Sequence, residues 1–279
     1  MGLSPFGWTV RTRSNAPSIP QKGTLRFKLI LNKCINSKYS YSLFPIGGLR
    51  GLTNIMKRHI PNFITCLNLF SGCVASYLAF KGNYQGAFIA ILIASAFDFM
   101  DGFAARLLKA YSAMGKELDS LADMVSFGLA PGAIVFSVLT ECKINEWLPF
   151  VGFLIPVFSG LRLAKFNIDD RQSTSFLGLP VPANAIFWAG LVYSFQSILM
   201  DNIWALVVLI VIFSLLLVSE LPMFSLKFKN VAWKNNQTQY LFLIGCVVIL
   251  AIFGLNAFAI IISWYIAMSV FVVLFKKAV

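Results

Sequence analysis

Apolar runs of about twenty residues recur from Ile60 to the end of the chain, and each is long enough to cross the roughly 30 Å hydrocarbon core of a bilayer as a helix. Hydrophobic residues make up 58% of the 279 residues and charged residues only 12%, which excludes an ordinary soluble domain. Backbone amide and carbonyl groups find no water in lipid, so helices that satisfy these groups internally are expected. The sequence therefore predicts an all-α integral membrane protein.

Polar connections divide the apolar region into about eight transmembrane helices. Lysine and arginine gather in every second connection, as at Lys109 and Lys116, whereas the alternate connections carry fewer of them. Cytoplasmic loops are enriched in these residues, so we expect both termini on the cytoplasmic side. The predicted spans cover residues 60–80, 85–108, 118–140, 147–166, 179–200, 203–221, 240–255 and 257–275.

The N-terminal part of the chain differs from the rest in charge. The first 58 residues hold ten Lys or Arg and no acidic residue, so most of the net charge of +12 lies there. We interpret residues 1–55 as a basic, mostly disordered cytoplasmic extension and residues 56–279 as the transmembrane domain. The alternatives are that this segment is an organellar transit peptide or that the protein starts at Met56. The basic residues are scattered rather than clustered, which argues against a nucleic-acid partner.

Four aspartates fall within 26 residues that otherwise resemble bilayer-spanning helix: Asp98, Asp101, Asp119 and Asp123. A carboxylate is costly to bury in a membrane, so its presence indicates a functional site. The first two are three residues apart and the last two are four apart, so each pair lies on one face of its helix. The short connection between the pairs predicts antiparallel neighbouring helices whose acidic faces meet near the cytoplasmic side.

Grouped carboxylates in a medium of low dielectric repel one another unless a cation lies between them. Oxygen ligands without nearby histidine or cysteine favour Mg²⁺, Mn²⁺ or Ca²⁺ over zinc. The only histidine of the chain, His59, argues against a multi-histidine metal site. One or two such ions held by aspartates are typical of enzymes that transfer phosphoryl groups.

Small residues accompany the aspartates. Gly102 and Ala105 follow the first pair and Gly115 precedes the second, so a diphosphate could approach the backbone closely. Arg106 is placed to meet phosphate oxygens, which its planar guanidinium binds well. The residues alone leave two alternatives open: helix packing for the glycines and a topological role for the arginine.

The pattern D-x2-D-G-x2-A-R-x8-G-x3-D-x3-D, from Asp98 to Asp123, resembles the signature of the CDP-alcohol phosphotransferase family of membrane enzymes. Segments 115–132, 160–167 and 176–185 are similar to the phosphatidylserine synthase branch of that family, and segment 60–72 is similar to the family's first span. The likeness extends from about Met56 through the middle of the chain and weakens after residue 200.

The resemblance implies a phosphatidyltransferase reaction in which CDP-diacylglycerol and L-serine give phosphatidylserine and CMP. Mg²⁺ or Mn²⁺, as one or two ions, would be the cofactor, and a homodimer is expected. Asp123 would be the general base, and would also touch a second ion. The resemblance assigns the metal site to Asp98, Asp101, Asp119 and Asp123, and CDP-lipid binding to Gly102, Ala105, Arg106 and Gly115.

Polar residues outside the motif are further candidates. Asn62, Thr65 and Asn68 in the first span could reach the nucleotide, or could only bond neighbouring helices. Arg162 and Lys165, three residues apart at the inner end of the fourth span, could hold the acceptor's carboxylate or phosphate. Their alternative is ordinary placement of basic side chains at the membrane surface.

Two other functions remain open at this stage. The motif does not by itself separate serine from glycerol 3-phosphate, inositol phosphate or choline, although the flanking segments favour serine. A cation-coupled transporter would explain the acidic residues, but not the glycines, the arginine and the spacing together. We expect the protein in a bacterial cytoplasmic membrane with its active site near the cytoplasmic face; an organellar membrane is the alternative.

Overall fold

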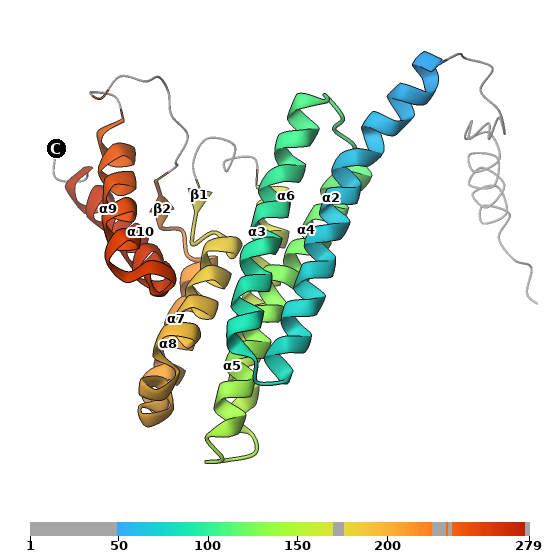
Figure 1. The fold of residues 1–279 in the computed structure, drawn as a ribbon. Coiled ribbons are helices and arrows are strands. Elements are labelled where there is room, and N and C mark those ends of the chain that lie inside the picture. The colour runs from blue at the N-terminus through green and yellow to red at the C-terminus, as the bar shows by residue number, and fades with distance from the viewer. Residues whose placement is uncertain (1–48, 170–175, 225–232, 234–235, 277–279) are drawn as a thin grey trace, which may run out of the picture. The chain divides into compact units, whose positions relative to one another are not determined.

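The computed structural model describes residues 49–169, 176–224, 233 and 236–276. These residues are helical except for short connections and one two-residue strand pair, which confirms the all-α prediction (Figure 1). The helices are α2 (Leu49–Phe80), α3 (Tyr84–Leu107), α4 (Ala113–Asp123), the π-helical η1 (Met124–Leu129), α5 (Ala130–Glu141), the 3₁₀ helix η2 (Leu148–Phe153), α6 (Leu154–Ile168), α7 (Val181–Asp201), α8 (Ile203–Val218), α9 (Gln237–Phe253), the 3₁₀ turn η5 (Gly254–Asn256) and α10 (Ala257–Lys276).

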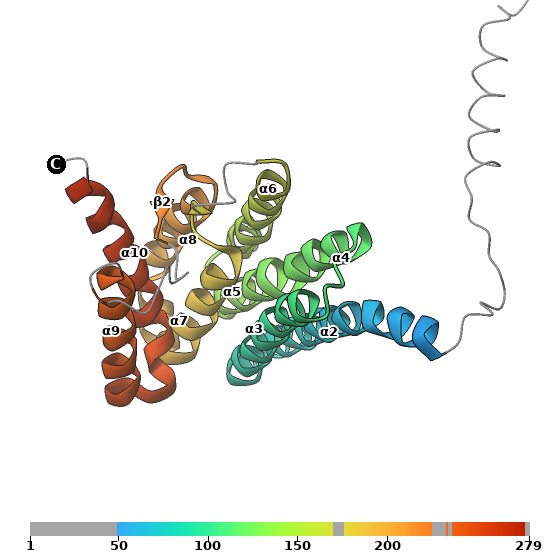
Figure 2. The same cartoon turned by 90° about the horizontal axis from the view of Figure 1, so that it is seen from above.

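Six helical stretches of the described chain are long and apolar enough to cross a membrane. The last of them contains two helices, α9 and α10, which pack side by side around a turn at Gly254, where φ is +56° (Figure 2). Helix α8 is apolar but only 16 residues long. The number of crossings and the side of each terminus stay predictions. The six stretches cover residues 59–80, 84–107, 113–141, 148–168, 181–201 and 237–274.

The predicted N-terminal extension lies mostly outside the described residues. Helix α2 begins at Leu49, within the last seven residues of the predicted 1–55 segment. The boundary at residue 56 stays a prediction.

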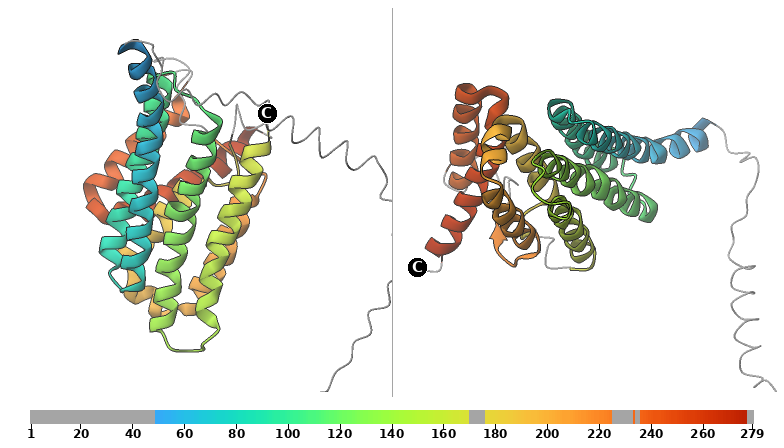
Figure 3. Two further views of the ribbon diagram at one scale, coloured as in Figure 1. Left: turned by 90° about the vertical axis from the view of Figure 1, so that its right-hand side faces the viewer. Right: turned by 90° about the horizontal axis from the view of Figure 1, so that it is seen from below.

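Helices α2 and α3 form a long hairpin that packs against the continuous helix α4–η1–α5 (Figure 3). The hairpin turns at Gly82, whose φ of +73° favours glycine, and Asn83 caps α3 by accepting a hydrogen bond from the Gly86 amide (2.9 Å). Ser112 caps α4 in the same way by accepting from the Gly115 amide (3.0 Å). These caps place the acidic segments of α3 and α4 next to each other.

The core of the bundle surrounds α5, most of whose residues are buried. Helices α2, η2 and α7 pack around it, and large side chains such as Phe88, Phe127 and Trp188 fill the interior. The acidic residues lie at one end of this core, so the apolar packing holds the helices that carry them.

A short antiparallel pair joins the segments that follow α6 and α8. Strand β1 (Phe176–Leu177) pairs with β2 (Pro222–Met223). Gly178 follows β1 with φ +75°, and a Cβ there would lie 2.6 Å from the Leu217 carbonyl oxygen. Only glycine is compatible with both the positive φ and this close contact. Gly178 therefore sets the path of the chain into the start of α7.

Candidate active site

Helices α3 and α4 both pack against α2, and this arrangement brings three of the four aspartates together. Asp98, Asp119 and Asp123 each offer a carboxylate oxygen within 4.8 Å of the others. All three side chains are partly buried. The spacing in the sequence placed each pair on one helical face, and the tertiary packing turns these faces toward each other.

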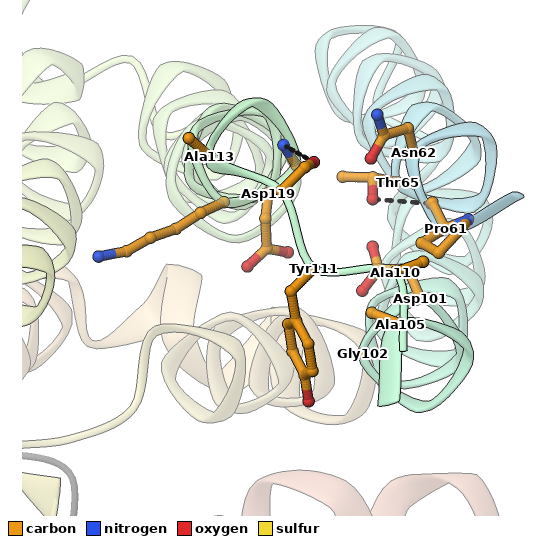
Figure 4. A pocket seen from close by; sticks show the side chains of 13 residues that line it. Pro61, Asn62, Thr65, Asp101, Gly102, Ala105, Ala110, Tyr111, Ala113 and Asp119 are labelled. Atoms are coloured by element: carbon orange, nitrogen blue, oxygen red, sulfur yellow. Dashed lines mark hydrogen bonds between the residues drawn. The ribbon is translucent and has the colours of Figure 1, made fainter. Parts of the chain in front are cut away.

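Asp101 lies next to this group but is not one of the three. Its carboxylate is 6% exposed and interacts electrostatically with Asp98, Asp119 and Asp123. Figure 4 shows Asp101 and Asp119 turned into the same cavity from opposite helices. The four carboxylates therefore surround one small region.

The donor set fits a hard divalent cation. Asp101 Oδ2 and Asp119 Oδ1 are buried without a hydrogen-bond partner among the described residues. A buried carboxylate oxygen without a donor is costly, and four such groups repel one another. Oxygen-only ligands in this number suit Mg²⁺ or Mn²⁺. Asp98, Asp101, Asp119 and Asp123 are the residues that could hold the ion.

A cavity of about 590 Å³ opens beside the carboxylates, between α2, α3 and the start of α4 (Figure 4). This volume lies within the range of roughly 300–1,000 Å³ that is usual for small-molecule sites. A Cβ on Gly115 would come within 3.0 Å of Asn62 Oδ1, so the glycine keeps this wall open. Five predicted CDP-lipid residues line the cavity: Asn62, Thr65, Gly102, Ala105 and Gly115.

The remaining predicted CDP-lipid residue, Arg106, is not part of that lining. Its Nε donates to the Gly102 carbonyl oxygen (2.9 Å), and its side chain is exposed at the end of α3. The arginine therefore lies beside the cavity, one turn after a glycine that lines it.

A second cavity, of about 280 Å³, lies on the other side of α4, toward α6 and α7. It shares Lys116 and Asp119 with the first cavity and also reaches Asp123. Arg162 lines it with a side chain that is only 4% exposed, and the Arg162 Nε has no hydrogen-bond partner among the described residues. Asp119 thus lines both cavities, Asp101 lines only the larger one, and Asp123 lines only the smaller one, which also contains the buried cation.

The structure separates the two predicted acceptor residues. Arg162 faces the second cavity, whereas Lys165 Nζ pairs with Glu220 Oε1 (3.4 Å) and does not line it. Successive residues of a helix point in directions about 100° apart, so residues three positions apart do not point in the same direction. A spacing of three therefore does not ensure that two side chains reach the same cavity.

Sequence reasoning missed three residues that line the smaller cavity, of which Lys116 also lines the larger one. Lys116 Nζ donates to the Asn167 carbonyl oxygen (3.4 Å), and Asn167 Nδ2 donates to Ser120 Oγ (2.9 Å). A signal was present: Lys116 and Ser120 lie inside segment 115–132, and Asn167 ends segment 160–167. Both segments resemble the phosphatidylserine synthase branch, but the site residues predicted in them are Gly115, Asp119, Asp123, Arg162 and Lys165.

Comparison with known proteins identifies the family of the chain. The family model described as CDP-alcohol phosphatidyltransferase matches residues 58–275. The chain belongs to this family. The matched range includes every residue that lines the two cavities. The aspartates, the glycines and Arg162 therefore all lie in the part of the chain that the family model covers.

Curated relatives of this family member include enzymes named CDP-diacylglycerol–serine O-phosphatidyltransferase. The Bacillus subtilis enzyme is 37% identical over 146 residues, which are 51% of this chain and 80% of that protein. The Saccharomyces cerevisiae enzyme is 39% identical over 163 residues, 52% of this chain and 58% of that protein. The Methanocaldococcus jannaschii enzyme is 31% identical over 201 residues, 72% of this chain and 86% of that protein.

Proposed function

We propose that this protein transfers the phosphatidyl group of CDP-diacylglycerol to the hydroxyl of L-serine, giving phosphatidylserine and CMP. The observation that carries the proposal is the group of Asp98, Asp119 and Asp123, in which Asp119 lines both cavities and Asp123 lines the smaller one. A two-substrate transfer needs one compartment for each substrate, with the reacting groups at their boundary. The names of the relatives support serine as the acceptor.

The larger cavity is the proposed site of CDP-diacylglycerol. Its small residues, Gly102, Ala105 and Gly115, leave room for the diphosphate against the backbone. Thr65 Oγ1 donates to the Pro61 carbonyl oxygen (3.0 Å) and also interacts with the Asp101 side chain, so it links this wall of the cavity to the carboxylates. Asn62 offers both a donor and an acceptor from the same helix, and Arg106 would reach phosphate oxygens from the rim.

Asp98, Asp101 and Asp119 would hold Mg²⁺ or Mn²⁺, and Asp123 would also touch a second ion. When bound, the cation would neutralise the diphosphate and stabilise the charge that develops on the departing CMP. Carboxylates with unpartnered buried oxygens support this assignment.

Asp123 is the proposed general base, because it borders the smaller cavity and belongs to the carboxylate group. The serine hydroxyl proton passes to Asp123 as the serine oxygen forms a bond to the lipid-side phosphorus. The bond from that phosphorus to the bridging oxygen breaks, and CMP leaves with the bridging oxygen.

Arg162 is the proposed partner of the serine carboxylate, since it is a buried cation in the smaller cavity. We expect Arg162→Gln to raise the KM for serine about 30-fold or more, because losing one partner of a buried charge pair costs about 2 kcal/mol or more. The KM for CDP-diacylglycerol should change little. Initial rates of CMP release at varied serine concentration measure the effect.

Lys165→Gln is the matched control, because Lys165 lies one turn away on the same helix and pairs with Glu220 instead. An exposed ion pair contributes at most about 1 kcal/mol, so this variant should stay within about fivefold of the wild-type constants. Equal losses in both variants would remove Arg162 as a specific serine ligand.

The activity itself is tested with purified full-length protein in CDP-diacylglycerol micelles containing Mn²⁺. CMP release is measured with L-serine, glycerol 3-phosphate, inositol phosphate, choline or no acceptor. We expect CMP and phosphatidylserine with serine only. Release of CMP with another alcohol would show that the acceptor is not serine. No release of CMP with any alcohol would favour the transporter alternative.

We also propose that the site faces the cytoplasm. Support comes from the basic connections, such as the one with Lys109 and Lys116, which adjoin the larger cavity. A bacterial cytoplasmic membrane is the proposed location. The homodimer stays a prediction from the family resemblance.

A further inference from the structure

Asp123 is the last residue of α4, and the π-helical turn η1 follows it directly. A π-helical turn inside an α-helix widens the backbone and frequently marks a functional site. Helices α2 and α6 both pack against η1. The position of Asp123 therefore depends on the contacts that hold this turn in place.

Helix α2 contacts η1 through its backbone. Ser126 Oγ donates to the Asn68 carbonyl oxygen (2.9 Å), and both residues are completely buried. A Cβ on Gly72 would lie 2.6 Å from Ser126 Cα and 2.8 Å from Ser126 N, so the glycine is required for this approach. The two backbones are thus held at a single relative position.

The Asn68 side chain extends this contact to Asp123. Asn68 Nδ2 donates to Asp123 Oδ1 at 3.4 Å, which is longer than the usual 2.9–3.0 Å. Asn68 Oδ1 is buried and has no hydrogen-bond partner among the described residues. An unpaired amide oxygen in the core lowers stability, and a leucine of similar branched shape would avoid that cost. The hydrogen bond from the Asn68 side-chain nitrogen to Asp123 therefore accounts for an amide at this position.

We propose that Asn68 is a positioning residue for the reaction. Its N–H occupies one carboxylate oxygen of Asp123 and turns the other toward the smaller cavity, where the acceptor hydroxyl would lie. The inference rests on the proposed role of Asp123 as the general base. It assigns Asn68, an orientation-setting residue outside the aspartate motif, to the catalytic step rather than to nucleotide binding.

The test uses Asn68→Leu in the full-length protein. We expect kcat to fall about 10-fold or more, the range seen when residues that orient a metal-site ligand are removed. The KM values for CDP-diacylglycerol and serine should stay within about twofold, and the thermal unfolding midpoint should be equal or higher because the unpaired oxygen is gone. If the variant does not fold, Asn68→Ala serves with the same expected fall in kcat.

Ser76→Ala is the matched control. Ser76 is buried on the same helix, and its Oγ donates to the Gly72 carbonyl oxygen (2.9 Å), outside both cavities. We expect wild-type kcat in this variant. Wild-type kcat in Asn68→Leu, or an equal fall in both variants, would overturn the proposal.

A second measurement does not depend on the reaction. Titration of Mn²⁺ into substrate-free protein should show an affinity about 10-fold or more lower in Asn68→Leu than in wild type, since Asp123 would no longer be oriented. If wild-type protein released no CMP with any alcohol, the proposed function would fail, and this titration alone would decide the role of Asn68. Equal Mn²⁺ affinity in the two proteins would then overturn it.

Discussion

Replacement of Asp123 by asparagine is expected to lower the rate of CMP release by about 10²- to 10⁴-fold, the usual contribution of a general base. The amide has nearly the same shape as the carboxylate but takes up no proton at neutral pH. CDP-diacylglycerol binding should persist, because Asp123 lines the smaller cavity and not the larger one. The measurements are single-turnover CMP release and binding of labelled CDP-lipid.

Asp201→Asn is a suitable comparison for that variant. Asp201 is an exposed aspartate at the end of α7 and lines neither cavity. The Asp201→Asn substitution makes the same chemical change outside the site, so turnover should match wild type. Near-normal turnover in Asp123→Asn would show that another group takes the serine proton.

Removal of divalent cations is expected to abolish activity completely and reversibly. Without a cation, the four carboxylates repel one another, and the diphosphate has no counter-charge. Mg²⁺ or Mn²⁺ should restore the rate, whereas Zn²⁺ should not, since the site offers neither histidine nor cysteine. CMP release before and after dialysis against chelator, and after each metal is added back, gives the result.

Stability provides an independent check of the same site. A ligand that binds only the folded state at 100 times its dissociation constant stabilises it by about 2.7 kcal/mol. Mn²⁺ should therefore raise the thermal unfolding midpoint of wild-type protein, and should raise it less in Asp119→Asn. Full activity after thorough chelation, together with an unfolding midpoint that does not respond to metal, would exclude metal-assisted transfer.

Much of the site could be predicted from local patterns. The spacing of Asp98 with Asp101, and of Asp119 with Asp123, determines which helical face each pair occupies, because an α-helix repeats every 3.6 residues. The short connection between these helices then leaves an antiparallel arrangement as the simple solution. The small residues Gly102, Ala105 and Gly115 were found for the same reason, since they belong to the same two helices.

Contacts between distant helices could not be predicted in this way. Arg162 and Lys165 share a helix, yet one lines the smaller cavity and the other pairs with Glu220, from the segment after α8. Lys116 and Asn167 meet because α6 packs against η1, which continues α4. The periodicity of residues within a helix does not specify which other helix it packs against.

Local patterns in the sequence predict a helical, membrane-embedded chain whose acidic faces lie in two consecutive helices. Hydrophobic length and helical repeat are local properties, so they can be read from the residues in order. Two arrangements appear only in the folded chain: Asp119 lines both cavities, and Asn68 of α2 reaches Asp123 across 55 residues of chain. Those arrangements depend on how side chains of separate helices fill the same space, which packing of the whole bundle determines.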